Sequence, residues 1–224
     1  MKIAESVVRK VLMIAVIILI PFILIMSSVR LLMNPFYLQI EYRMPGFPPD
    51  SYGFTLQDRL KWSTISLDYL LNDQGISFLA DKTFADGTPI YNERELSHLV
   101  DVKNVVQSLL RDWLIAIILF LVISLLGWRL KWWSDIRKGI SIGGWATIGV
   151  IVLILVFVVT SFATFFTDFH ELFFTANSWV FLYSDTLIRL FPMRFWQDGF
   201  IYIGTMCIIA GFLLGWFLRT KPSR

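Results

Sequence analysis

The sequence predicts an all-α polytopic membrane protein, a four-transmembrane-helix bundle with an extracytoplasmic segment between its first and second membrane helices. Of the 224 residues, 56% are hydrophobic, and they gather in four blocks, each long enough to cross roughly 30 Å of hydrocarbon. Basic and acidic residues are concentrated between different blocks, which predicts the side that each loop faces. In chain order the predicted segments are a cytoplasmic N-terminus (1–10), a first membrane helix (11–33), an extracytoplasmic segment (34–104), a second membrane helix (105–127), a cytoplasmic loop (128–139), a third membrane helix (140–166), an extracytoplasmic loop (167–199), a fourth membrane helix (200–218) and a cytoplasmic tail (219–224).

The first block follows a short basic segment that contains Lys2, Arg9 and Lys10. A basic segment before an apolar run resembles a secretory signal. This run, however, is long enough to span the membrane and ends without a clear small-x-small cleavage site. We therefore expect a retained signal anchor.

The distribution of charge predicts the topology. The three segments expected in the cytoplasm hold ten Lys and Arg residues and only two acidic residues, Glu5 and Asp135. The remaining 15 acidic residues, with ten basic ones, fall in the two regions expected outside. Under the positive-inside rule this pattern places both termini of a multi-pass membrane protein in the cytoplasm. The net charge of +3 then reflects topology, and a nucleic-acid partner is not predicted.

The second membrane helix is expected to begin well outside the lipid. Asn92 and Glu95 have the spacing of a capping box, and apolar residues then recur at helical intervals, so one helix runs from Glu93 into the second block. Polar residues gather along one side of this helix: Arg94, His98, Asp101, Asn104, Ser108, Arg111 and Asp112. Such a stripe indicates either a hydrated groove within the bundle or charged side chains that reach the membrane surface.

The third and fourth blocks offer less chemistry. Their glycines, among them Gly143, Gly144 and Gly211, favour close helix packing. The single cysteine, Cys207, excludes an internal disulfide and suits packing within the fourth block. In the loop between these two blocks, Asp185 has the character of an N-cap for a short helix that Pro192 limits.

The sequence contains two histidines, and each is predicted at the outer end of an apolar helix. His98 precedes the second block and His170 follows the third. We expect the two rings to converge at the membrane surface, where imidazole can accept and donate protons near neutral pH. Asp101, Asp168 and Glu171 are the carboxylates placed to orient them. Two histidines and a carboxylate also suit a metal, but no H-x-x-x-H spacing is present, and no metal or other cofactor is predicted.

Three motifs point to a known family. The stretches Asn92-Glu93-Arg94-Glu95, His98-Leu99-x-Asp101-Val102 and Phe169-His170-Glu171-Leu172-Phe173-Phe174, with four spans and one histidine in each external region, resemble the bacterial integral membrane family that includes the lipoprotein intramolecular transacylase. The resemblance implies transfer of the sn-2 acyl chain of a diacylglyceryl lipoprotein to the α-amine of its N-terminal cysteine at the outer face of the membrane. It also implies a multi-pass protein of the bacterial cell membrane, and that His98 and His170 match the essential histidines of the family.

This reaction needs a proton acceptor for the amine and a proton donor for the departing glycerol oxygen. We assign His170 as the base and His98 as its partner, although the two roles can be exchanged. Arg189, Arg194 or backbone amides are candidates to stabilise the oxyanion. The predicted partners are the lipoprotein substrate and membrane lipids, and no oligomeric state is predicted. The alternative is a non-enzymatic membrane protein that binds a lipid, peptide or partner subunit through its extracytoplasmic segment.

Overall fold

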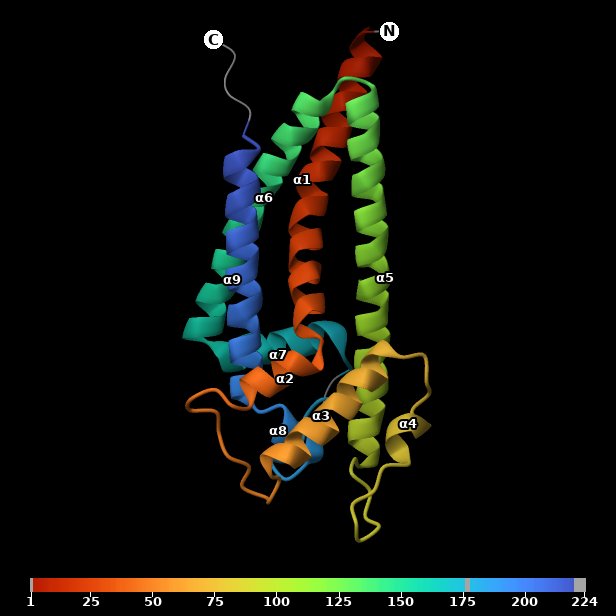
Figure 1. Ribbon diagram of the computed structural model, residues 1–224, viewed down its shortest axis with the longest axis vertical. Coiled ribbons are helices and arrows are strands. Elements are labelled where there is room, and N and C mark those ends of the chain that lie inside the picture. Colours follow the sequence, from red (N-terminus) through yellow and green to blue (C-terminus); the bar gives the residue numbers. More distant parts are fainter. Residues whose placement is uncertain (1, 176–177, 220–224) are drawn as a thin grey trace. The chain divides into compact units, whose positions relative to one another are not determined.

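The computed structural model describes residues 2–175 and 178–219, and its named elements there are all helices (Figure 1). Most of the predicted C-terminal tail, from residue 220 onward, lies outside the described residues, as do Met1 and residues 176–177. The elements are α1 (Lys2–Leu32), α2 (Pro35–Glu41), α3 (Leu56–Leu71), α4 (Ser77–Ala80), α5 (Glu93–Arg129), α6 (Trp133–Thr160), α7 (Phe162–Phe173), α8 (Thr186–Leu190) and α9 (Met193–Phe217).

Four helices are long and apolar enough to cross a membrane, namely α1, α5, α6 and α9. The predicted fold class is therefore confirmed. Helix α5 has 37 residues, about 55 Å at 1.5 Å per residue, whereas the hydrocarbon is about 30 Å thick. That length leaves room for its first turns to extend beyond the lipid.

The chain divides into two compact units, and each of the four long helices contributes residues to both. One unit comprises Met1–Arg30, Leu110–Val156 and Ile201–Arg224. The other comprises Leu31–Leu109 and Phe157–Phe200, and it contains both histidines. The two units are called the apolar unit and the histidine unit below.

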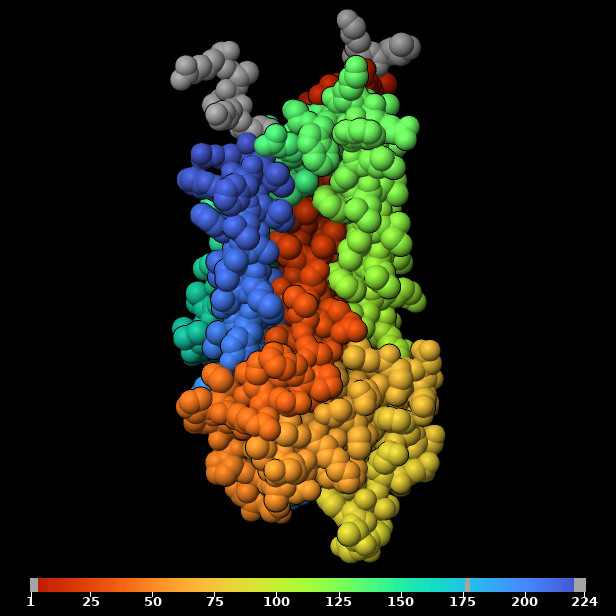
Figure 2. All heavy atoms as spheres, in the orientation of Figure 1, coloured from red at the N-terminus to blue at the C-terminus, as the bar shows by residue number. Residues whose placement is uncertain are grey.

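The apolar unit is held together by close approach of its helices. A Cβ atom added at Gly144 of α6 would lie 2.6 Å from the carbonyl oxygen of Gly211 of α9, so this crossing requires glycine. Arg9 and Asp135 form an ion pair at 2.6 Å. On the face shown in Figure 2, α5 and α9 lie at the surface, and many of their apolar side chains are exposed, as expected of helices that face lipid.

The histidine unit has its own hydrophobic core. It is formed by residues of the segment between α1 and α5, of the start of α5 and of α8: Trp62, Tyr69, Leu79, Ile90, Tyr91, Leu99, Leu187 and Leu190. Helix α3 begins with a complete capping box between Thr55 and Asp58. A buried ion pair at 3.1 Å joins Asp50, in the loop before α3, to Arg189 of α8. The sequence analysis assigned no helices to this segment, in which the structure has α2, α3 and α4.

The third apolar block is divided. We predicted one membrane helix over 140–166, but α6 ends at Thr160 and α7 begins at Phe162. Ser161, between them, has φ −150° and ψ 51°, which is not helical. Its carbonyl still accepts a hydrogen bond from the N–H of Phe165, so it serves as the start of the new helix. The composition does not change across the break, so hydropathy does not reveal it.

Candidate functional site: the histidine pair

His98 lies in the second turn of α5, close to a well-fixed helix end. The predicted capping box is present, because Asn92 N–H donates to the Glu95 carboxylate at 2.8 Å and Glu95 N–H donates to the Asn92 side chain at 3.0 Å. The other Glu95 oxygen accepts the N–H of Leu187 in α8 at 2.7 Å. Glu95 therefore joins the start of α5 to α8, one turn before His98.

His170 lies in the last turn of α7, and its own helix fixes its ring. Its Nδ1 lies 2.7 Å from the backbone carbonyl oxygen of Phe166. A carbonyl only accepts, so Nδ1 carries the hydrogen and donates it. In the neutral ring the lone pair is then on Nε2, which is free to accept a proton. The sequence analysis expected a carboxylate in this position.

The two rings lie together, as predicted from the sequence. Their centroids are 6.2 Å apart and their planes are inclined by 25°. His98 is 7% exposed and His170 is 9% exposed. Residues 72 positions apart in the chain thus form one buried imidazole pair.

Aromatic side chains surround the pair. His98 contacts Phe174 and Phe181, with ring centroids 4.8 and 5.4 Å away. His170 contacts Phe166 at 4.0 Å and Trp179 at 4.8 Å. Burial lowers the pKa of His170 below its ordinary value of 6.5, and the hydrogen bond to the Phe166 carbonyl opposes that shift. The ring of His170 is therefore neutral at pH 7 and able to act as a base.

Two polar atoms in this pocket have no protein partner among the described residues. They are Nδ1 of His98 and Nε1 of Trp179, and both are buried. A buried polar group without a partner is unusual and costs free energy unless something bound completes its hydrogen bond. Both atoms are therefore available to a substrate.

The three predicted supporting carboxylates do not bond to the Nδ1 atoms of the rings. Asp168 and Glu171 flank His170 but are exposed, and the Phe166 carbonyl occupies its Nδ1. Asp101 is half-buried on α5. Within 2–175 and 178–219, no cluster of three or more His, Cys, Asp or Glu side chains is arranged to hold a metal ion.

The basic residues suggested for the oxyanion have other partners. Arg189 donates two hydrogen bonds of 3.1 Å to Asp50, and Arg194 pairs with Asp198. Arg111 and Asp112, the deepest members of the polar stripe, lie 3.6 Å apart with side chains 71% and 54% exposed. This exposure favours side chains that reach the membrane surface over an internal groove.

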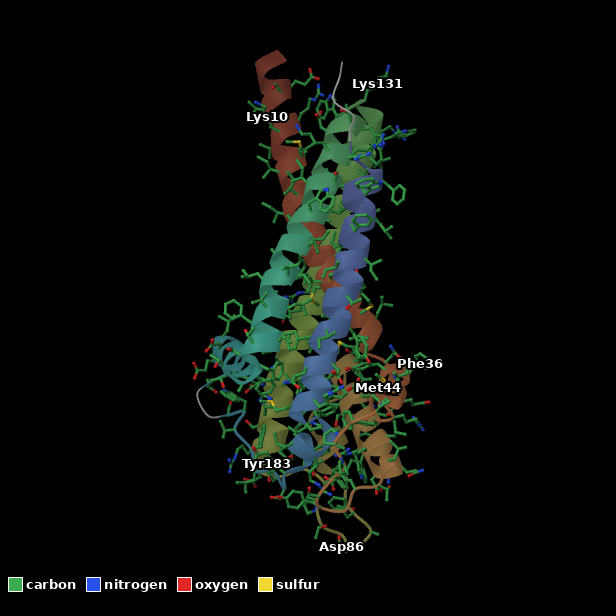
Figure 3. All side chains as sticks on the ribbon, turned by 90° about the vertical axis from the view of Figure 1, so that its left-hand side faces the viewer. Lys10, Phe36, Met44, Asp86, Lys131 and Tyr183 are labelled. Atoms are coloured by element: carbon green, nitrogen blue, oxygen red, sulfur yellow. The ribbon has the colours of Figure 1, made fainter. Side chains whose placement is uncertain are left out.

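Two features of the site were not predicted from the sequence. Glu95 was expected as a cap but not as the link to α8, because that contact joins segments about ninety residues apart. No role was predicted for Trp179. The loop between α7 and α8 carries exposed rings such as Tyr183, labelled in Figure 3, which is 81% exposed, and composition alone does not distinguish these from the buried Trp179 nitrogen.

Comparison with known proteins supports an enzyme. The family model described as lipoprotein intramolecular transacylase Lit matches residues 14–196. An uncharacterized protein of Aquifex aeolicus (strain VF5) is 26% identical over 208 residues, which is 92% of each chain. The solved structure of the membrane integral lipoprotein intramolecular transacylase Lit from Bacillus cereus has a TM-score of 0.66 at 16% identity and covers 93% of each chain. A variant of that protein with one histidine replaced by alanine has a TM-score of 0.69 at 19% identity, covering 94% of this chain and 91% of its own.

Proposed function

The chain belongs to the lipoprotein intramolecular transacylase (Lit) family, and on this premise we propose that it moves the sn-2 acyl chain of a diacylglyceryl lipoprotein to the α-amine of the N-terminal cysteine. The product is the lyso form of the same lipoprotein. Family membership makes the protein a multi-pass integral membrane enzyme with a lipoprotein substrate. We further propose that the sn-2 ester bond is broken and an amide bond to the cysteine nitrogen is formed, and that the site faces outward while both termini lie in the cytoplasm.

Proton transfer is assigned to the histidine pair. Nε2 of His170 takes the proton of the attacking amine, because its Nδ1 is committed to the Phe166 carbonyl. His98 gives a proton to the glycerol oxygen as it leaves. His170 then holds one proton more and His98 one proton fewer. Passage of that proton from His170 to His98 makes both imidazoles neutral again, and the net result moves one hydrogen from the amine to the glycerol.

The observation that carries the proposal is the 6.2 Å separation of the two rings. A substrate bound beside the pair can contact both imidazoles. This suits a reaction in which the amine nitrogen loses a proton and the glycerol oxygen gains one. Ester and amine belong to the same lipoprotein, so positioning alone supplies much of the acceleration. No covalent acyl-enzyme is required, and the buried thiol of Cys207 has no part in the reaction.

A lipopeptide with distinguishable acyl chains tests the proposal. The purified protein in detergent micelles is given a synthetic diacylglyceryl peptide with palmitoyl at sn-1 and oleoyl at sn-2. Tandem mass spectrometry is expected to find oleoyl on the cysteine nitrogen and a free hydroxyl at sn-2. Palmitoyl on nitrogen, or a free fatty acid with an unmodified amine, would contradict the proposed reaction.

The same assay separates transfer within one molecule from transfer between two. Two lipopeptides of different peptide mass, each with its own sn-2 acyl chain, are mixed with the enzyme. Each peptide is expected to retain its own acyl chain, and exchange between the two peptides would contradict an intramolecular route. Wild-type protein inactivated by heat serves as the control for spontaneous transfer.

A further inference from the structure

We propose that the indole N–H of Trp179 donates the hydrogen bond that stabilises the oxyanion formed during acyl transfer. This inference rests on the proposed function and assigns to that site a catalytic donor that the family resemblance does not supply. It follows from two observations, the unpartnered state of the Trp179 nitrogen and its position beside His170. The substrate group concerned is the ester carbonyl at sn-2.

The Trp179 nitrogen is unusual among the indoles of this protein. Its Nε1 is buried and has no acceptor among the described residues. By contrast, Trp113 donates to the Ser27 hydroxyl at 3.1 Å, and Trp196 donates to the Phe191 carbonyl at 3.1 Å. Indole nitrogen can only donate, so the missing partner of Trp179 must be an acceptor, and a carbonyl oxygen that gains negative charge is a strong one.

The position of Trp179 fits that role. Its ring centroid lies 4.8 Å from that of His170, with the planes inclined by 39°, and it also contacts Phe166, whose carbonyl orients His170. An acceptor bonded to Trp179 would therefore lie near the His170 ring. A buried donor beside that ring is already desolvated and oriented, which is the arrangement that stabilises a developing oxyanion.

The two arginines suggested as oxyanion donors have other partners. Arg189 is held by Asp50 and packs over the ring of Phe54 at 3.4 Å, and Arg194 pairs with Asp198. A neutral donor also suits this pocket better than a guanidinium, because burial among aromatic rings penalises a charge that has no partner before the oxyanion forms.

The acyl transfer forms one amide bond and breaks one ester bond. The lone pair of the amine nitrogen forms a bond to the sn-2 carbonyl carbon, and the π pair of that carbonyl moves onto its oxygen, which accepts the hydrogen bond from Trp179. One imidazole removes a proton from the nitrogen. The oxygen pair then re-forms the carbonyl, the bond between carbon and the glycerol oxygen breaks, and the second imidazole protonates that oxygen. The proton gained by the first imidazole passes to the second, which restores both neutral rings, and no oxidant, reductant or further reactant takes part.

Removal of the N–H without a change of ring shape tests the proposal. Site-specific incorporation of 3-benzothienylalanine at position 179 replaces the N–H with sulfur in a ring of nearly the same size. We expect kcat for the lipopeptide reaction to fall by about 100-fold, the loss typical of one oxyanion donor, with KM changed less than threefold. Trp179→Phe is a second variant, in which both ring size and donor are altered.

A matched control is available at Trp196, whose N–H has a backbone acceptor. The same replacement at position 196 is expected to leave kcat within about threefold of wild type. An equal loss at both positions, or a position-179 variant within twofold of wild type in kcat, would overturn the role of Trp179. The wild-type protein is the reference. If it does not transfer the sn-2 chain, the proposed function itself is refuted. If it does, and the position-179 variant is unaffected, only the role of the indole donor is refuted.

Discussion

Glu95 provides a quantitative test of how the structure positions His98. Its carboxylate is 1% exposed and accepts one N–H from Asn92 and one from Leu187. Replacement by alanine removes both acceptors and leaves the Leu187 N–H buried. A hydrogen bond to a charged group contributes about 1.5–3 kcal/mol, so we expect Glu95→Ala to lower the free energy of unfolding by about 3–5 kcal/mol.

Two further variants at the same helix end sharpen this test. Glu95→Gln keeps one oxygen acceptor but turns an NH₂ group toward the other N–H, so about half of the loss is expected. Glu93→Ala removes an exposed carboxylate in the first turn and is expected to cost less than about 1 kcal/mol. Unfolding in mixed micelles with increasing SDS, followed by circular dichroism, measures all three.

The activity of these variants should follow the same order. Because His98 lies one turn after Glu95, loss of the link to α8 frees the ring to leave its position beside His170. We expect kcat of Glu95→Ala to fall by at least tenfold at a temperature where the variant remains folded. If Glu95→Ala is no less stable than Glu93→Ala, the reasoning that this carboxylate joins α5 to α8 is refuted.

Three other predictions follow from packing and charge. Burial lowers the pKa of His170 below its ordinary value of 6.5, so the ring stays neutral at pH values somewhat below 6.5. The acid limb of the kcat–pH profile should therefore lie below pH 6.5. An acid limb above pH 7 would exclude this ring as the base. A side chain at Gly144 would meet the Gly211 carbonyl, so Gly144→Ala should lower the free energy of unfolding by about 1–3 kcal/mol. No atom lies within 4 Å of a Cβ added at Gly149, so Gly149→Ala should lower it by less in the same SDS titration. Burial raises the pKa of Glu41 to about 7, so its ionisation costs stability as the pH rises from about 5 to above 7, and Glu41→Gln should flatten that part of the stability–pH curve.

Much of the fold could be predicted from local patterns. Apolar blocks of membrane-spanning length and the Asn92–Glu95 spacing each depend on a few neighbouring residues. For that reason the four long helices and the start of α5 at Glu93 agree with the sequence. The helices of the segment between α1 and α5 were missed because α3 mixes polar and apolar residues and takes its stability from the core around Trp62 and Tyr69.

The break at Ser161 and the details of the site could not be predicted in this way. The residues on both sides of Ser161 are mostly apolar, so hydropathy alone does not mark the change of helix. The partner of a histidine nitrogen is decided by folding, and His170 uses the carbonyl of Phe166, which every residue type at that position would offer. The convergence of the two rings was expected from their places at helix ends and from the family motifs, whereas the unpartnered Trp179 nitrogen has no counterpart in the sequence pattern.

The central claim is that His98 and His170 act as one proton-transferring pair, and a double-mutant cycle tests it most directly. Single-turnover rates of lipopeptide transacylation are measured for wild type, His98→Ala, His170→Ala and the double variant, with circular dichroism to confirm that each is folded. We expect each single variant to lose about 100- to 10,000-fold and the double variant to be no slower than the worse single variant, because residues that act as a unit are not additive. Losses that multiply in the double variant, or a single variant with near wild-type rate, would contradict the account.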